Sequence, residues 1–215
     1  MTYQKVKLIE RAPLSLNQRV EILLVYAHQK PATILYVENQ DNYNPHKNIY
    51  EHSKRQLKDV LSLLDKINVS YGVGEMEQFE TGRMDIDANG YEIQLSYCVE
   101  RVPISVAQSD DKRDALLAAL NNEDDYELGR LFGFPETAIL AFHGILSPFM
   151  GDLYDGTPHG YFTQFVFSQN FFDEEYRSTS VRWHDTVKRL SPRMCDEIKK
   201  FYNDNIITKA SLDWR

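Results

Sequence analysis

A tight link between two short helices, in residues 128–142, constrains the fold of this chain more than any other segment. Its sequence is Leu-Gly-Arg-Leu-Phe-Gly-Phe-Pro-Glu-Thr-Ala-Ile-Leu-Ala-Phe. Gly133 can adopt the positive φ that ends one helix, and Pro135 suits the first turn of the next. Apolar side chains recur at helical spacing on both sides of this turn, so the two helices are expected to bury a shared face. The residues expected on that face are Leu128, Leu131, Phe132, Phe134, Ile139 and Phe142.

The same segment has the spacing of a DNA-binding helix-turn-helix. Gly129 is the small residue of the first helix, Gly133 makes the turn, and Ile139 is the β-branched residue of the second helix. The chemistry of the second helix argues against DNA reading, because residues 135–143 include no Lys, Arg, Asn or Gln to donate to bases or phosphates. We therefore expect a structural helix pair and keep a DNA-binding regulator as a minor alternative.

Residues Leu128–Ala138 resemble the Leu-Gly-x-Leu-Leu-Gly-Tyr-Pro-x-Cys-Cys segment of some poorly characterised microbial proteins. Thr137 and Ala138 stand where those proteins carry the paired cysteines. A metal or redox role tied to that pair is therefore not implied for this chain. The resemblance covers about a dozen residues and implies a shared local fold.

Strand and helix patterns intermix before residue 109. Strands are expected over residues 3–9, 33–37, 69–73, 83–86, 91–99 and 103–107, the last at a sheet edge, and helices over 15–29 and 45–67. The Asn-Gly pair at 89–90 is a strong hairpin signal. No steady strand–helix–strand rhythm is present, so the pattern favours an α+β fold with a small mixed or antiparallel sheet and helices in the N-terminal half.

The part of the chain after residue 109 reads as mostly helical. Ser109 and Ser191 are expected to cap helices, and residues 161–167 are expected to add one further, strongly aromatic strand. A length of 215 residues suffices for a sizeable core without disulfides or metals. We predict a single compact domain over 1–215, with a sub-division near residue 108 into an α+β part (1–108) and a mainly helical part (109–215) as the alternative.

The charge and the cysteines bear on partners and compartment. Net charge is -8, and residues 81–160 hold fourteen Asp/Glu against five Lys/Arg. This acidity disfavours a nucleic-acid partner and suits a cationic partner, a metal or a solvated surface. No apolar run is long enough for a membrane span, and the N-terminus has no apolar signal core. Cys98 and Cys195 lie in no metal spacing, so we expect reduced thiols in a cytoplasmic protein without membrane contact.

A glycine- and proline-rich stretch, residues 149–160, holds the first group of candidate site residues. Asp152 and Asp155 lie three apart, and His159 could complete a divalent metal site. His143 and His184 are, with His159, the candidate catalytic acid–base residues. No recognised ligand spacing is present, so an ordinary surface loop is the alternative reading, and no cofactor is expected beyond such a metal.

Aromatic side chains cluster between residues 149 and 172. Core packing explains such a cluster, and the alternative is an aromatic-walled pocket for a ring-containing ligand. Tyr154, Tyr161 and Phe162 are the candidate ligand-binding residues of that pocket.

These observations rank the functions without deciding among them. The leading expectation is a soluble intracellular binding or regulatory protein that engages a small-molecule ligand or a protein partner through the acidic middle region and the aromatic loop. The alternative is a metal-assisted hydrolase acting on a small phosphorylated or nucleotide substrate. No Gly-x-Ser-x-Gly nucleophile elbow is present, and the sequence leaves the oligomeric state open.

Overall fold

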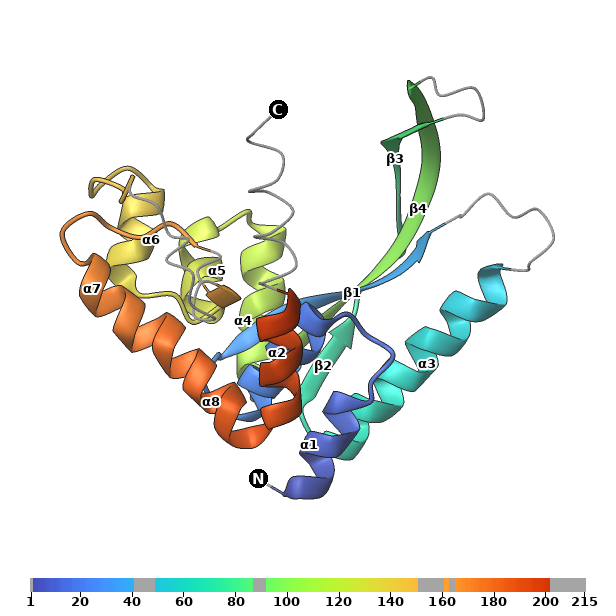
Figure 1. Cartoon of the computed structure of the whole chain (residues 1–215), viewed down its shortest axis with the longest axis horizontal. Helices are drawn as coiled ribbons and strands as arrows, with labels where there is room; N and C mark the ends of the chain where they lie inside the picture. Colours follow the sequence, from blue (N-terminus) through green and yellow to red (C-terminus); the bar gives the residue numbers. More distant parts are fainter. Residues whose placement is uncertain (1, 41–48, 87–91, 151–160, 163–164, 202–215) are drawn as a thin grey trace.

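The strands form one antiparallel sheet around a single long strand, β4. Our computed structural model describes residues 2–40, 49–86, 92–150, 161–162 and 165–201 (Figure 1). The strands are β1 (Ala32–Gln40), β2 (Ser70–Val73), β3 (Glu77–Ile86) and β4 (Glu92–Ala107). β1 pairs along one edge of β4, whereas β2 and β3 share the other edge. The far ends of β3 and β4 project beyond the helices, at the upper right of Figure 1.

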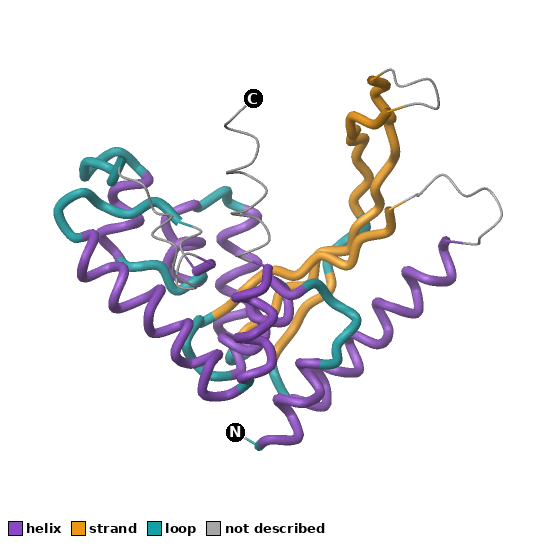
Figure 2. Tube along the Cα trace, in the orientation of Figure 1, coloured by secondary structure: helices purple, strands orange, loops and turns teal. Residues whose placement is uncertain are grey.

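Helices make up most of the remaining structure, so the α+β class is confirmed (Figure 2). They are α1 (Tyr3–Glu10), α2 (Leu16–Tyr26), α3 (Ile49–Ile67), α4 (Asp110–Asn121), α5 (Asp125–Leu131), α6 (Glu136–Phe142), α7 (Phe172–Glu175), the π-helical turn η2 (Tyr176–Val181), α8 (Arg182–Leu190) and a last helix over 192–201. Ser15 and Ser109 cap α2 and α4 as expected. Within the described ranges, none of these helices is long and apolar enough to cross a membrane.

The expected N-terminal strand over residues 3–9 is wrong, because this segment is the helix α1. Its buried apolar residues, Val6 and Ile9, lie three apart and therefore on one helical face. Lys5 ties the helix to the end of α3 by donating to the carbonyl of Ile67 at 2.8 Å. A segment of eight residues fits both the strand and the helix period, so packing against a neighbour decides between them.

The expected edge strand over residues 103–107 is instead the inner end of β4, paired on both sides. Pro103 suggested an edge because proline has no N–H for a sheet ladder. In the structure Pro103 lies where pairing with β3 has ended at Arg101 and pairing with β2 begins at Ile104. A missing N–H costs least at such a break.

The expected aromatic strand over residues 161–167 is also wrong for the part that is described. Residues 161–162 form a 3₁₀ turn, and residues 165–167 belong to no strand. Among the described residues, pairing here consists of one isolated bridge between Pro148 and Ser168. It is flanked by hydrogen bonds from the amide of Phe149 to the carbonyl of Phe167 at 2.7 Å and from the amide of Gln169 to the carbonyl of Ser147 at 2.8 Å. The aromatic side chains of this segment pack against other rings, so they do not need a neighbouring strand to be buried.

Alternate residues of β1 enter two different cores. Leu35 and Val37 belong to the larger core, which draws on α1, α2, α3, β4, α8 and the last helix. Ala32 belongs to the smaller core beside Leu116 of α4 and Leu131 of α5. Successive side chains of a strand point to opposite faces of the sheet. Helices therefore cover both faces of the sheet at its inner end.

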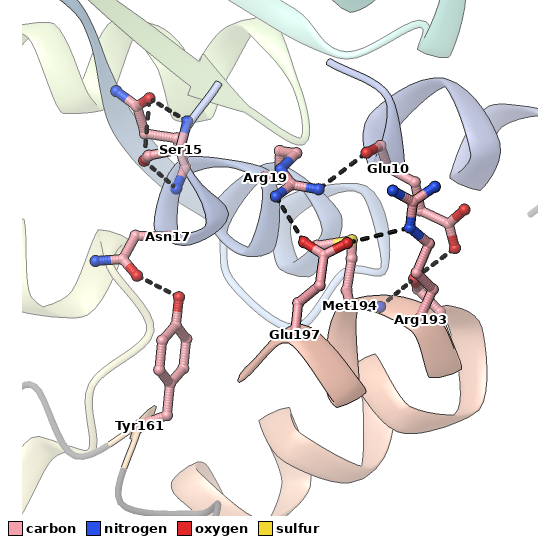
Figure 3. Close-up of polar contacts among 10 residues, drawn as sticks. Glu10, Ser15, Asn17, Arg19, Tyr161, Arg193, Met194 and Glu197 are labelled. Atoms are coloured by element: carbon pink, nitrogen blue, oxygen red, sulfur yellow. Dashed lines mark hydrogen bonds and ion pairs between the residues drawn. The ribbon is translucent and has the colours of Figure 1, made fainter. Parts of the chain in front are cut away.

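Arg19 of α2 links three helices through polar contacts (Figure 3). Its guanidinium donates to the carbonyl of Glu10, at the end of α1, and to the carboxylate of Glu197 in the last helix, at 2.9 and 2.8 Å. Ser191, which caps that last helix, also donates to the buried carboxylate of Glu10 at 2.6 Å. Burial acts to raise the pKa of Glu10, but hydrogen bonds from Lys7 and Ser191 outweigh it and lower the pKa. These contacts join the first and last helices of the described chain.

The helix pair in residues 128–142 has the expected turn. Gly133 has φ 79°, and Pro135 is the N-cap of α6 rather than its first helical residue. A Cβ added to Gly129 would lie 2.8 Å from Cγ1 of Ile139, so the absence of a side chain at Gly129 lets the two helices approach. Phe142 departs from the expected buried face, since its exposed fraction is 61%.

We predict that Gly129→Ala destabilises the protein through this contact. The new methyl group forces Ile139 to move, and we expect a net loss of about 1 kcal/mol after the gain in helix propensity. Urea unfolding measures the change. In an Ile139→Ala background the same substitution should be neutral or stabilising, because the clashing side chain is gone. Equal losses in both backgrounds would show that the contact does not limit the approach of the helices.

Candidate ligand-binding site

All three predicted metal ligands, and one of the candidate ligand-binding residues, lie outside the described residues. Asp152, Tyr154, Asp155 and His159 fall in the range 151–160, so their roles stay predictions. His143 is described: it is the exposed C-cap of α6, and its ring lies 6.0 Å from the ring of Tyr126. Across the described ranges, no group of three or more His, Cys, Asp and Glu residues is placed to hold a metal ion.

His184 contacts Cys195 and Asp185, and a cysteine, a histidine and an aspartate are the residue types found in sites with a catalytic thiol. Its Nε2 lies 3.6 Å from Sγ of Cys195, and its Nδ1 lies 3.2 Å from a carboxylate oxygen of Asp185. Thiol catalysis needs an accessible thiolate of lowered pKa. Cys195 is buried, and burial raises the pKa of its thiol. The contact therefore packs a neutral thiol in the core, where His184 is also buried.

Two adjoining cavities mark the strongest candidate site. The first, here called the polar cavity, has a volume of about 180 Å³ and lies beside the edge strand β1, between α2 and α8. Its walls include Tyr161 and Phe162, two of the candidate ligand-binding residues. The hydroxyl of Tyr161 donates to Oδ1 of Asn17 (Figure 3). Burial, and after it the charge of Glu21, raises the pKa of Tyr161, so this phenol stays neutral.

An ion pair between a buried lysine and a partly buried glutamate lies in the wall of the polar cavity. Nζ of Lys30 is 2.8 Å from both carboxylate oxygens of Glu21, and Thr33 donates to the same carboxylate at 3.0 Å. Nζ also lies 4.2 Å from the ring centroid of Trp183, within cation–π range. Burial lowers the pKa of Lys30, whereas the charge and hydrogen bonds of Glu21 act in the opposite direction. A buried lysine with a lowered pKa beside a cavity is typical of functional sites.

The turn between α5 and α6 shapes the wall next to this lysine. A Cβ on Gly133 would lie 3.4 Å from the carbonyl oxygen of Gln29 and 3.5 Å from Cα of Lys30, so the turn packs directly on that backbone. Phe134 follows the turn, and its ring centroid is 5.8 Å from Nζ of Lys30. Phe134 also stacks on Phe165 at 4.9 Å. The helix pair therefore places an aromatic wall over a buried charge.

The π-helical turn η2 sets the opposite wall. It leads directly into α8, whose second residue is Trp183. Within η2, the hydroxyl of Ser180 donates to the carbonyl of Phe162 at 3.2 Å. π-Helical turns are rare and are found frequently at functional sites. Here η2 holds both Trp183 and Phe162 in the lining of the polar cavity.

The second cavity, here called the apolar cavity, has a volume of about 450 Å³ and shares Phe132 and Phe134 with the first. Its other lining residues come from α5, α6 and the segment after residue 164: Asp125, Leu128, Gly129, Ala138, Ile139, Phe142, Phe165 and Val166. Among these, Asp125 alone carries a charge. The size and the apolar lining are typical of small-molecule sites.

Many acidic residues of the middle region have local roles in the described structure. Asp124 caps α5 by accepting from the amide of Glu127 at 3.0 Å. Asp110 and Asp114 pair with Arg113 at 2.9 and 2.8 Å. Carboxylates in the first turn also suit the positive end of a helix. These roles account for part of the acidity without a cationic partner.

Three central residues of the polar cavity have no local sequence signal that indicates a site. Lys30 precedes Pro31 and reads as a solvated loop residue, and Glu21 reads as a surface position of an amphipathic helix. Trp183 has no sequence context that indicates a site. Tyr161 and Phe162 do line the cavity, yet their contact with a ligand stays a prediction.

We predict that Glu21→Gln destabilises the protein by about 2 kcal/mol at pH 7, because Lys30 is then buried without its counter-ion. Losing Glu21 lowers the pKa of Lys30 further below its unfolded value of about 10.4. Between these two pKa values the unfolded state binds more protons, so stability rises with pH. Chemical unfolding between pH 6 and 10 measures this slope.

The matched control for this prediction is the double variant Glu21→Gln/Lys30→Met, which removes both charges. Its stability should exceed that of Glu21→Gln at pH 7, and the difference should shrink as the pH approaches 10. A constant difference across that range would contradict a titrating Lys30.

We predict that Cys195 does not react as an activated thiol. In a Cys98→Ser background it is the one remaining cysteine, so a disulfide reagent such as Ellman's reagent reports on it alone. We expect slow reaction in the native state at pH 7 and complete reaction in denaturant, because Sγ is enclosed and its pKa is raised. Rapid native reaction that His184→Ala abolishes would instead support thiol catalysis.

Comparisons with known proteins provide no independent indication of what the site binds. No protein-family model, no curated protein and no solved structure matches the chain. The resemblance of Leu128–Ala138 to a segment of microbial proteins therefore stays a prediction. The paired cavities and the ion pair of the buried Lys30 with Glu21 are the features from which a function has to be argued.

Proposed function

We propose that this protein binds a small, ring-containing molecule in the paired cavities. The observation that carries the proposal is the shared wall of Phe132 and Phe134, which joins an apolar cavity of about 450 Å³ to a polar one of about 180 Å³. Binding sites of this kind combine mostly apolar walls with a few placed polar groups. A cytoplasmic location remains part of the proposal, and a free, buried Cys195 is consistent with it.

The exposure of the rim supports entry from solvent. Phe142 lines the apolar cavity and is nevertheless 61% exposed, and Val166, another lining residue, is also exposed. Behind this rim, Ala138 and Ile139 are buried. A ligand entering here would cover apolar surface that now faces water, which favours binding.

A small-molecule ligand is favoured over a protein partner by the shape of the site. The apolar surface is concave and backed by the stacked rings of Phe134 and Phe165. The acidic residues Asp110, Asp114 and Asp124 are engaged in caps and ion pairs rather than arranged around the cavities.

We expect an uncharged fluorescent probe, N-phenyl-1-naphthylamine, to bind saturably with increased emission. Ala138→Phe should weaken this binding at least about tenfold, because the added ring fills the cavity. Ala118→Phe on α4 is the matched control, since Ala118 is exposed and lines neither cavity. It should bind the probe like the unmodified protein.

Thermal melting verifies that both variants fold before their binding is compared. Absence of saturable binding to the unmodified protein would overturn the proposed function. Equal weakening by Ala138→Phe and Ala118→Phe would show that the probe binds elsewhere.

A further inference from the structure

One face of α2 supplies accessible polar groups to the wall of the polar cavity. Asn17, Val20 and Glu21 line this cavity, and they lie three and four residues apart in the helix. Side chains at this spacing are neighbours on one helical face, with Cβ atoms about 5–6 Å apart. Asn17 is exposed, and the side chain of Glu21 is 26% exposed. A molecule in the cavity can therefore contact both polar side chains.

The side-chain amide of Asn17 is held with its donor available. Its Oδ1 accepts from the hydroxyl of Tyr161, another lining residue (Figure 3). An asparagine amide has one carbonyl acceptor and two N–H donors. Within the described part of the chain, Nδ2 of Asn17 donates to no other residue. Because Oδ1 is bonded within the wall, the N–H groups remain to donate to a bound molecule.

Glu21 places an acceptor one helical turn further along the same face. Its Oε2 accepts from Lys30 and Thr33, whereas its Oε1 accepts from Lys30 alone among the described residues. A carboxylate oxygen can accept two hydrogen bonds, so Oε1 can accept one more. Lys30 already neutralises Glu21, and no other lining residue of the polar cavity carries a formal charge. The acceptor therefore suits an uncharged donor, because a charged ligand would enter without a counter-ion.

The other walls of the polar cavity suit a flat ring. Phe134, Phe162 and Trp183 line the cavity, and aromatic rings favour stacked or edge-on contacts with such side chains. A cavity of about 150 Å³ is enough to hold benzene, and this one measures about 180 Å³. One six-membered ring with small substituents therefore fits beside α2.

We infer that the polar cavity binds an uncharged 4-aminopyrimidine ring, the ring that cytosine and adenine contain. The ring nitrogen next to the amino-bearing carbon accepts from Nδ2 of Asn17, and the amino group donates to Oε1 of Glu21. In DNA recognition, asparagine contacts adenine in this way and carboxylates accept from the amino group of cytosine. The inference rests on the proposed function and specifies the ligand of the same site.

Two pairs of probes of matched size test this hydrogen-bond pattern on the unmodified protein. They are cytosine with uracil, and 4-aminopyrimidine with 4-methylpyrimidine. Uracil presents a carbonyl oxygen to Glu21 and a ring N–H to Asn17, which reverses the pattern. 4-Methylpyrimidine keeps the ring nitrogen and lacks the amino donor. Uracil and 4-methylpyrimidine should each bind at least about tenfold more weakly than their partners, the effect of one hydrogen bond to a charged group.

¹H–¹⁵N NMR titrations measure these affinities and read the site directly. Cytosine should move the side-chain NH₂ signals of Asn17 downfield, as expected for a new hydrogen bond. Cytidine, as a fifth probe, distinguishes the two sources of the ring. Binding as tight as that of cytosine identifies a nucleoside, and weaker binding identifies the free base.

Asn17→Asp tests the donor, and the loss of the NH₂ signals in this variant assigns them. A carboxylate at position 17 can still accept from Tyr161, and it suits the first turn of α2. The variant should weaken 4-aminopyrimidine and 4-methylpyrimidine alike, each at least about fivefold, because both use the ring nitrogen. Asn122→Asp is the matched control, since Asn122 is exposed and lines neither cavity, and it should alter neither affinity.

The outcomes distinguish this inference from the proposed function. Melting curves first verify that both variants fold. If N-phenyl-1-naphthylamine binds but cytosine leaves the Asn17 signals unmoved, the ligand class is wrong and the proposed function stands. The inference is likewise overturned if uracil binds as tightly as cytosine, or if Asn17→Asp leaves the affinity for 4-aminopyrimidine unchanged. If no probe binds at all, both proposals fail together.

Discussion

The contact between the Gly133 turn and the backbone of Gln29 and Lys30 is the constraint on which the rest of the site depends. The positive φ of 79° at Gly133 favours glycine, and a Cβ at this position would lie 3.4 Å from the carbonyl oxygen of Gln29, at van der Waals contact. Because the turn packs there, Phe134 reaches the lysine side chain, and α5 and α6 take their places beside the inner end of β1. One close approach thus joins the helical part of the chain to the edge of the sheet.

This arrangement buries the charge of Lys30. Lys30 is stabilised by the carboxylate of Glu21 and by the ring of Trp183, which come from α2 and α8 respectively. A hydrophobic pair at these two positions would pack as well without the cost of desolvation. An ion pair retained in a cavity wall is therefore more typical of a binding surface than of a core built for stability alone.

Local signals in the sequence identified much of the fold but little of the site. Caps at Ser15 and Ser109, the hairpin between β3 and β4, and the Gly133 turn are each encoded by neighbouring residues, so they could be predicted. The short segment over residues 3–9 fits two periods, and the aromatic residues 165–167 have no strand to pair with, so local patterns misled there. The meeting of Glu21, Lys30 and Trp183 depends on tertiary packing alone, which no spacing in the sequence encodes.

The spacing of the helix pair suggests DNA recognition, whereas in the structure the pair forms the walls of a cavity. Gly129 and Ile139 do pack as in a helix-turn-helix, yet the same close approach leaves an apolar cavity lined by both residues. In a DNA-binding unit the outer face of the second helix would carry donors; here α6 contributes Ala138, Ile139 and Phe142 to the cavity lining. The chemical character of α6 thus decides between the two uses of one backbone geometry, and it favours an uncharged, ring-containing ligand over a phosphate backbone.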